Sequence, residues 1–202
     1  AVDITKQSID IVKKKAKKAA GVFEKGEAET YLLSSNGLER EERSTGMYLS
    51  MRAMMNKNAS GHTVTVSRMK NKFDYIKTAE KAAQIAKQAK MPRKSVSGKY
   101  DVLFDTHAFA NVLEHFAHSA SIFSVEAGLS CLPDMVGKKV AGDSITIYDD
   151  ATYPNGYGST AFDDEGHPTQ KNVLVDKGIF KGYLHNTSTA KRYKTKSTAN
   201  AD

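Results

Sequence analysis

The dipeptide Asn36–Gly37 constrains the fold of this chain more than any other feature of its sequence. Both residue types tolerate a positive φ angle, so Asn-Gly between two extended runs is a strong signal for a tight β-hairpin. After a break at Gly46 the extended pattern resumes, and further strands are predicted at residues 38–43, 48–54 and 62–68. Residues 27–67 are therefore predicted to form an antiparallel meander.

Apolar residues at helical spacing predict one helix before the meander and one after it. Gly21 suits the end of the first helix, and Pro92 stops the second, which is predicted over residues 71–90. The small alanines of the second stripe imply close packing on the meander. The first stripe comprises Ile4, Ile11, Val12, Ala16 and Ala19, and the second comprises Phe73, Ile76, Ala79, Ala83 and Ala86.

A linker with the sequence "PRKSVSGK" predicts a domain boundary between residues 96 and 97. The second domain, 97–202, is predicted to open with a buried strand in "KYDVLFD", followed by a helix over residues 106–123. The core side of this helix is predicted to consist of Phe109, Val112, Leu113 and Phe116. A strand over residues 143–150, a long loop and a hairpin turning at Lys177–Gly178 follow, while the polar residues 189–202 show no periodicity. The predicted fold class is α+β: a small antiparallel meander with packed helices in 1–96, then the start of a larger, mostly β domain.

The composition limits which classes of binding partner and which cellular compartment are expected. The 202 residues carry a formal net charge of +7, which permits binding to nucleic acid, anionic membrane or acidic peptide without establishing any of them. The lysines of residues 13–18 have no interleaved aromatics, so a solvated helix face is the favoured interpretation. Cys131 is the only cysteine, which excludes an internal disulfide framework, so a cytoplasmic protein is expected. Cys131 itself is expected to be a small core residue. No apolar run approaches the roughly 20 residues that span a bilayer, and no secretory signal is expected.

The helix over residues 106–123 gathers candidate metal ligands. His107, Glu114 and His118 fall on one stripe with His115 beside them. A zinc-protease helix carries His-Glu-x-x-His, with two imidazoles four residues apart, whereas this chain reads Glu-His-x-x-His. The alternatives are chelation by the imidazoles three residues apart and a helix whose polar histidines lie on its wet edge.

The acids of the long loop form the second cluster: Asp149 and Asp150 at its start, and the adjacent Asp163, Asp164 and Glu165, followed by Gly166 and His167. Calcium loops need carboxylates at alternating positions, and this run does not supply them. On a strand, Asp163 and Glu165 would share a face and receive a lysine, an arginine or a peptide N-terminus. In a turn, the acids would cap backbone amides while Gly166 takes a positive φ angle.

Several motifs together resemble the TldD/TldE (PmbA) family of peptide-maturation proteases, also described as modulators of DNA gyrase. The motifs are, in order, "SSNGLE", "SGKYDVLFD", "GLS", "TIYDD", "FDDEGHPTQKNVLVDKGIFKGYLHN" and "TAKRY". The run from Phe162 to Asn186 is the most specific. Members of that family are longer at both ends, so the chain resembles a short member or a middle fragment.

The resemblance implies a two-subunit assembly in which one subunit, TldD, carries a zinc motif, His-Glu-x-x-x-His, at the helix after the "YDVLF"-type strand. Here Ala108 stands in place of the general-base glutamate, so the chain is most similar to the partner subunit, TldE/PmbA. The implied function is the non-catalytic subunit of a zinc-dependent peptide-processing protease, without a metal or cofactor of its own. The implied partners are a TldD-like zinc subunit or a second copy of the chain. The resemblance assigns Asp163, Asp164, Glu165, Gly166 and His167 to loop ordering or an interface.

Two alternatives remain. A basic module that binds nucleic acid or DNA gyrase would use the lysines of residues 13–18 and 87–99, although such binding is expected to be weak and non-specific. A metallopeptidase that is active alone would use Glu114, His115 and His118. The sequence does not decide the peptide substrate, or whether the assembly is a homodimer or a heterodimer.

Overall fold

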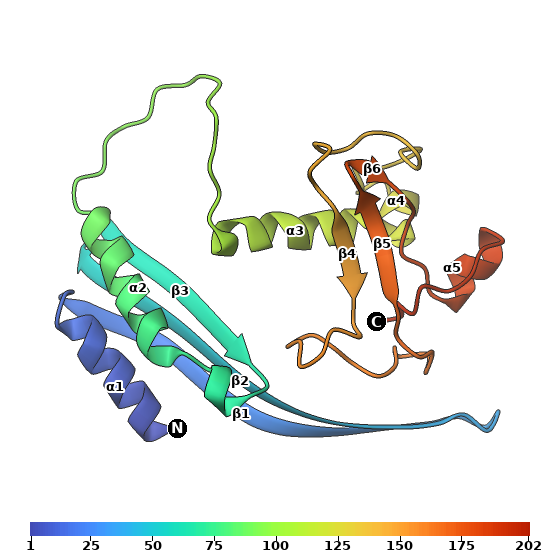
Figure 1. Cartoon of the computed structure of the whole chain (residues 1–202), viewed down its shortest axis with the longest axis horizontal. Helices are drawn as coiled ribbons and strands as arrows, with labels where there is room; N and C mark the ends of the chain where they lie inside the picture. Colours follow the sequence, from blue (N-terminus) through green and yellow to red (C-terminus); the bar gives the residue numbers. More distant parts are fainter. The chain divides into compact units, whose positions relative to one another are not determined.

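A computed structural model describes residues 1–202, and the chain divides into two compact units. The first unit contains residues 1–28 and 43–107, and the second contains residues 29–42 and 108–202. Helices and antiparallel sheets occur in both, which confirms the α+β class (Figure 1). The domain boundary between residues 96 and 97 stays a prediction. No helix has the length and apolar character that crossing a membrane requires.

The first unit is a three-stranded sheet with two helices. Its sheet has the order β1-β2-β3, and β2 and β3 pair antiparallel with Leu49 opposite Thr65. Figure 1 shows α1 and α2 next to each other along this sheet. The elements are α1 (Val2–Lys13), β1 (Lys18–Leu33), β2 (Glu39–Asn56), β3 (Ala59–Ser67), a 3₁₀ turn η1 (Lys70–Lys72) and α2 (Tyr75–Gln88).

The hairpin between β1 and β2 turns where the sequence predicts it. Gly37 has a φ angle of +82°, its N–H donates to the Ser34 carbonyl at 3.0 Å, and the Ser34 N–H donates to the Leu38 carbonyl at 3.0 Å. The predicted break at Gly46 is wrong, because β2 runs through it without interruption and the meander has three strands, not four. A glycine inside a strand costs only about 0.5–1 kcal/mol, which pairing with neighbouring strands offsets.

The first helix is shorter than predicted. The helix ends at Lys13. The Lys17 N–H donates to the Met54 carbonyl at 3.0 Å, so the chain already pairs with β2 at a point where the apolar pattern still predicts helix. Gly21 therefore lies inside β1 and does not end the helix. A Cβ atom there would lie 2.3 Å from the Ser50 carbonyl oxygen, so the glycine permits a close approach of β1 and β2.

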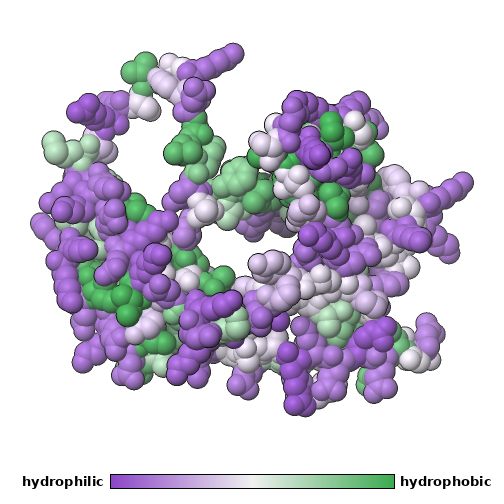
Figure 2. Space-filling model, viewed as in Figure 1, coloured by the Kyte–Doolittle hydropathy of each residue, from purple (hydrophilic) through white to green (hydrophobic).

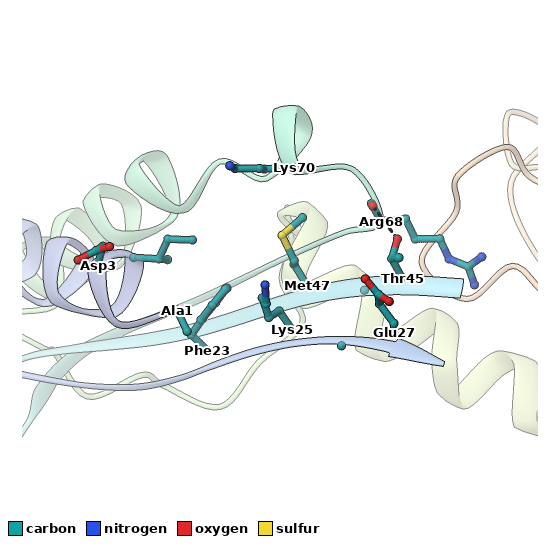
Figure 3. Close-up of a pocket in the computed structure, with 12 residues that line it drawn as sticks. Ala1, Asp3, Phe23, Lys25, Glu27, Thr45, Met47, Arg68 and Lys70 are labelled. Carbon is teal, nitrogen blue, oxygen red and sulfur yellow. Dashed lines mark hydrogen bonds between the residues drawn. The ribbon is translucent and has the colours of Figure 1, made fainter. Parts of the chain in front are cut away.

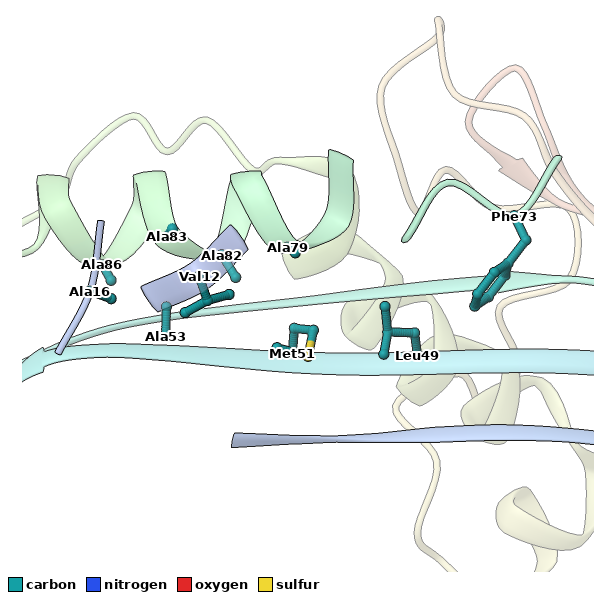
Figure 4. Close-up of a cluster of buried hydrophobic side chains, with 10 residues drawn as sticks. All are labelled: Val12, Ala16, Leu49, Met51, Ala53, Phe73, Ala79, Ala82, Ala83 and Ala86. Carbon is teal, nitrogen blue, oxygen red and sulfur yellow. The ribbon is translucent and has the colours of Figure 1, made fainter. Parts of the chain in front are cut away.

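Small side chains let α2 lie close to the sheet. A Cβ atom on Gly61 of β3 would lie 2.2 Å from the Ala82 carbonyl oxygen, which only a glycine avoids. Ile76, predicted in this core, is 47% exposed, because the buried stripe of α2 runs through Ala79, Ala82 and Ala86 and Ile76 falls outside it. Figure 4 shows the buried cluster, which consists of Val12, Ala16, Leu49, Met51, Ala53, Phe73, Ala79, Ala82, Ala83 and Ala86.

The second unit contains a small antiparallel sheet of the order β4-β5-β6 and short helices. Its hairpin turns at Lys177 (φ 46°) and Gly178 (φ 80°), as predicted. Its core consists of Ala120, Leu132, Leu174, Val175 and Phe180. The elements are α3 (Thr106–Ala120), whose first two residues belong to the first unit, α4 (Ile122–Glu126), β4 (Ile147–Asp150), β5 (Lys171–Asp176), β6 (Ile179–Phe180) and α5 (Thr187–Arg192).

Three burial predictions for the second half are wrong. Residues 99–105 form no strand, and Leu103 is 99% exposed. Phe109 and Val112 of α3 are exposed, and so is Cys131. An apolar side chain makes burial favourable, but burial also needs a second surface to cover it, and the sequence of these segments does not identify one.

Candidate functional site

Asp163 organises the acid-rich loop through hydrogen bonds of its backbone N–H and of its side-chain carboxylate. Phe162 and Pro168 form an antiparallel bridge, so the residues between them fold back as a closed loop. The Asp163 N–H donates to the His167 carbonyl at 3.0 Å, and Asp163 Oδ1 accepts from the N–H groups of Glu165 at 3.1 Å and His167 at 2.8 Å. Asp163 is buried, and the segment is a turn, not a strand.

The same carboxylate holds a segment far along the chain. Asp163 Oδ2 accepts from the Ala201 N–H at 3.2 Å, and the Asp164 N–H donates to the Ala201 carbonyl at 3.2 Å. Nearby, Asp149 Oδ2 accepts from the side-chain amides of Asn172 at 2.9 Å and Asn200 at 3.0 Å. Both carboxylates are thus used as acceptors that join loops of the second unit.

Glu165 and His167 connect the loop to helix α5. Glu165 Oε2 accepts from the Thr187 N–H at 2.8 Å, at the first residue of the helix. His167 Nε2 lies 2.8 Å from Thr187 Oγ1. A negative charge at a helix N-terminus is stabilising, because the first N–H groups have no partner within the helix.

Gly166 receives the hairpin of residues 29–42. Its φ angle is +78°, and its carbonyl accepts from Arg40 Nε at 3.1 Å. Glu42 Oε2 accepts from Thr160 Oγ1 at 2.6 Å and from the Ala161 N–H at 3.0 Å. The arginine that reaches the loop thus contacts a backbone carbonyl, and the predicted role of the acids in receiving a cation from another segment or subunit stays a prediction.

A cavity of about 680 Å³ borders the acid-rich loop. Its lining includes Asp149, Asp163, Asp164 and His118. The carboxylates of Asp149 and Asp163 already accept hydrogen bonds from protein N–H groups, so they are poorly placed to act as proton-transfer groups. These residues line the cavity with polar groups, and the hydrogen bonds of Asp149 and Asp163 hold loops of the second unit together.

The histidines of α3 do not belong to a group of three or more metal ligands. His107 Nε2 lies 2.8 Å from the Val64 carbonyl oxygen, and Glu114, His115 and His118 are exposed. No group of three or more His, Cys, Asp or Glu side chains in the chain has the geometry to hold a metal ion.

The first unit carries an open cavity of about 640 Å³. Figure 3 shows Phe23 and Met47 at this cavity together with Lys25, Arg68 and Glu27. Cations and carboxylates are mixed there, which does not favour a phosphate site. The lysines of residues 13–18 are exposed, and hydrophilic side chains cover most of the face in Figure 2.

The fold and the site define an α+β protein with an internally hydrogen-bonded acid-rich loop. The model of the PmbA/TldA metallopeptidase central domain matches residues 1–91, and that of the C-terminal domain of the same family matches residues 97–202. The chain belongs to this family, and the resemblance carried by residues 162–186 is confirmed.

Individual relatives support the assignment. The chain is 36% identical over 124 residues to a metalloprotease TldD homolog of Buchnera aphidicola, covering 60% of this chain and 26% of that protein. The structure is similar to that of a candidate modulator of a DNA gyrase from Thermotoga maritima, with a TM-score of 0.92, 26% identity, and coverage of 99% of this chain and 48% of the other. It is also similar to TldE from Thermococcus kodakarensis, with a TM-score of 0.74, 26% identity, and coverage of 98% and 47%. The chain spans less than half the length of these three proteins.

Proposed function

We propose that this chain is a TldE/PmbA-type, non-catalytic subunit of a zinc-dependent, two-subunit peptidase that processes peptides in the cytoplasm. Membership of a metallopeptidase family gives the class of activity. No group of residues in this chain has the geometry to hold a metal ion, which supports a TldD-like partner as the subunit that carries the zinc. Self-association is the alternative arrangement.

The observation that carries the proposal is the lack of further ligands around His107. A carbonyl oxygen only accepts hydrogen bonds, so His107 Nε2, 2.8 Å from the Val64 carbonyl, carries a hydrogen, and the lone pair is on Nδ1. No group of three or more His, Cys, Asp or Glu side chains that could hold a metal ion forms with it. The next residue is Ala108, which cannot act as a general base. The residues of this chain do not fit a zinc site, so no catalytic step is assigned to them.

Without a catalytic step, the proposed role of the second unit is to provide an ordered surface that a partner subunit or a peptide binds. Asp163 closes the acid-rich loop, Glu165 ties it to α5, and Arg40 ties the hairpin to Gly166. These contacts join three separate stretches of sequence. A partner subunit or a peptide meets a preformed arrangement, and less conformational entropy is lost on binding.

The proposal is tested by producing the chain with and without a paralogue that carries His-Glu-x-x-x-His. Peptide cleavage is expected only when both are present, and changing the paralogue's motif glutamate to glutamine should abolish it. His107→Ala in this chain is expected to leave the zinc content of the complex unchanged. Cleavage by this chain alone, with one bound zinc, would show that it is an independent metallopeptidase.

One observation favours a second function, binding to nucleic acid: the exposed lysines around residues 13–18 and the net charge of +7. Such binding would be electrostatic and would fall steeply as salt rises, without sequence preference. A titration of duplex DNA of two unrelated sequences at low and physiological salt separates the functions. Tight binding to one sequence at physiological salt would favour the nucleic-acid module over the peptidase subunit.

A further inference from the structure

A second cavity lies in the second unit, away from the acid-rich loop. Its volume is about 480 Å³, and its lining includes Val136, Lys171, Lys181, Tyr183, His185 and Tyr193. It shares no lining residue with the cavity at the acid-rich loop. Its size falls in the range of about 300–1,000 Å³ that is usual for small-ligand sites.

His185 is the buried polar group of this cavity, with 8% of its surface exposed. Its Nδ1 lies 3.2 Å from Thr189 Oγ1. The Thr189 hydroxyl donates to the nearer acceptor, Asn186 Oδ1 at 3.0 Å, and accepts from the Asn186 N–H at 3.1 Å. The Asn186 carbonyl, at 3.2 Å, is a second acceptor for the same hydroxyl hydrogen. With that hydrogen directed to Asn186, we assign the imidazole hydrogen to Nδ1, which leaves the lone pair on Nε2.

His185 Nε2 has no protein partner among the hydrogen bonds of the chain. No side-chain nitrogen or oxygen in the chain is both inaccessible and unpartnered, so Nε2 is reached from the cavity that His185 lines. Burial lowers the pKa of His185, an effect that the nearby Glu126 partly opposes. The cavity wall thus presents a neutral imidazole that accepts a hydrogen bond.

Two lysines that line the same cavity as His185 supply positive charge. Lys171 Nζ lies 3.5 Å from an Asp150 carboxylate oxygen and 3.9 Å from the ring centroid of Tyr148. Lys181 Nζ lies 3.4 Å from an Asp176 carboxylate oxygen. Both lysine side chains are about half exposed, and ion pairs of this kind are weak, so each ammonium can exchange its partner for a ligand carboxylate.

We propose that this cavity binds the C-terminal residue of a peptide, an inference that rests on the proposed peptide-processing function. The terminal carboxylate pairs with Lys181 and Lys171, and the N–H of the terminal residue donates to His185 Nε2. Apolar groups of Val136 and Tyr183 contact the terminal side chain. The dianion of a phosphomonoester would satisfy the lysines but carries no hydrogen for Nε2, so a peptide end matches the site better.

The test is binding of a blocked tripeptide, acetyl-Gly-Gly-Leu with a free carboxylate, to the full chain, followed by calorimetry and by the ¹⁵N signals of the histidines. We expect the free acid to shift the Nε2 signal of His185 and its C-terminal amide to bind about tenfold more weakly. Phenyl phosphate, whose dianion has no hydrogen to donate, is expected to leave that signal in place. Equal affinity for acid and amide, or displacement of the peptide by phenyl phosphate, would overturn the proposal.

Matched variants separate the contacts. His185→Asn keeps an N–H that reaches Thr189 but removes the group that faces the cavity, and should abolish binding, whereas His185→Gln retains an acceptor at the outer position and should restore part of it. Lys181→Met should weaken the binding of the free acid and leave the binding of the amide unchanged. Lys138→Met, outside the cavity, should change neither affinity.

Wild-type affinity in His185→Asn would refute the assignment. If that variant does not fold, the acid–amide comparison and Lys181→Met still decide. These measurements need neither zinc nor a partner, so they fail independently of the proposed function.

Discussion

Asp163 and His167 hold each other through two reciprocal hydrogen bonds. The Asp163 N–H donates to the His167 carbonyl at 3.0 Å, and the His167 N–H donates to Asp163 Oδ1 at 2.8 Å. The carboxylate also accepts from the N–H groups of Glu165 and Ala201. A buried carboxylate that accepts three backbone hydrogen bonds explains how an acid can lie inside a basic protein without a cation beside it.

Asp163→Asn is predicted to destabilise the chain. The amide puts an NH₂ group where one carboxylate oxygen accepted from backbone N–H groups, so donor faces donor and the free energy of unfolding should fall by about 1–3 kcal/mol. Urea denaturation measures the change. Asp164→Asn is the control, because Asp164 is exposed, and should stay within about 0.5 kcal/mol of wild type. Equal losses in the two variants would contradict the role of Asp163.

Glu165→Gln is predicted to weaken association with a TldD-like partner and to leave the partner's metal site intact. The change removes a negative charge 2.8 Å from the Thr187 N–H at the start of α5. A negative charge in this position stabilises a helix end by about 0.3–1 kcal/mol. Assembly is measured by sedimentation and cleavage by peptide turnover in the reconstituted complex. Normal assembly with abolished cleavage would make the carboxylate catalytic and the interface prediction wrong.

Turn chemistry was predictable because it is local. Asn36–Gly37 and Lys177–Gly178 carry the conformational preference in their own backbones, and both turns are where the sequence places them. Helix α5 was missed because its six residues are too short to show a period. Its signal was present in the capping box formed by Asn186 and Thr189.

The contacts of the acid-rich loop were less accessible to sequence reasoning. Adjacent acids indicate a turn, but the donors that Asp163 uses include Ala201, 38 residues further on, and nothing local identifies it. Arg40 lies 126 residues before the carbonyl that it contacts. The apolar run at Leu103 failed for a related reason, because hydrophobicity predicts that burial is favourable without identifying the partner surface.

Gly166→Val is predicted to destabilise the contact between the loop and the hairpin. The φ angle of +78° is unfavourable for a β-branched residue, and a Cβ atom would lie 2.3 Å from Leu38 Cδ2. The backbone strain alone costs roughly 1–3 kcal/mol. Thermal unfolding checks this, with Gly158→Val as the matched control, because a Cβ atom there meets nothing within 4 Å and Gly158 has no positive φ angle. Equal effects would show that the site tolerates a side chain.

The purified chain is predicted to bind no stoichiometric zinc. His107 Nε2 is engaged with the Val64 carbonyl, and His115 and His118 lie on an exposed helix without a third ligand. Metal analysis after dialysis is the measurement, with His115→Ala as the comparison. One tightly held zinc per chain that is lost in His115→Ala would contradict the prediction and revive the interpretation as an independent metallopeptidase.

The stability of the chain is predicted to fall as the pH drops below about 6.5, in part through His185. Burial lowers its pKa in the folded state, so above pH 6.5 the imidazole is neutral in both states, and below it the unfolded chain takes up a proton first. The decrease continues until the pH passes the pKa of His185 in the folded state, and the stability then levels off.

The charged and titratable groups near the imidazole or around its cavity are Glu126, Arg192, Tyr193, Lys171 and Lys181. Urea denaturation of wild type and His185→Gln between pH 7.5 and 5 isolates this residue, because His62, whose pKa is also lowered by burial, contributes equally to both. The variant should show the shallower decrease, and an identical or steeper one would mean that His185 is not kept neutral by the fold.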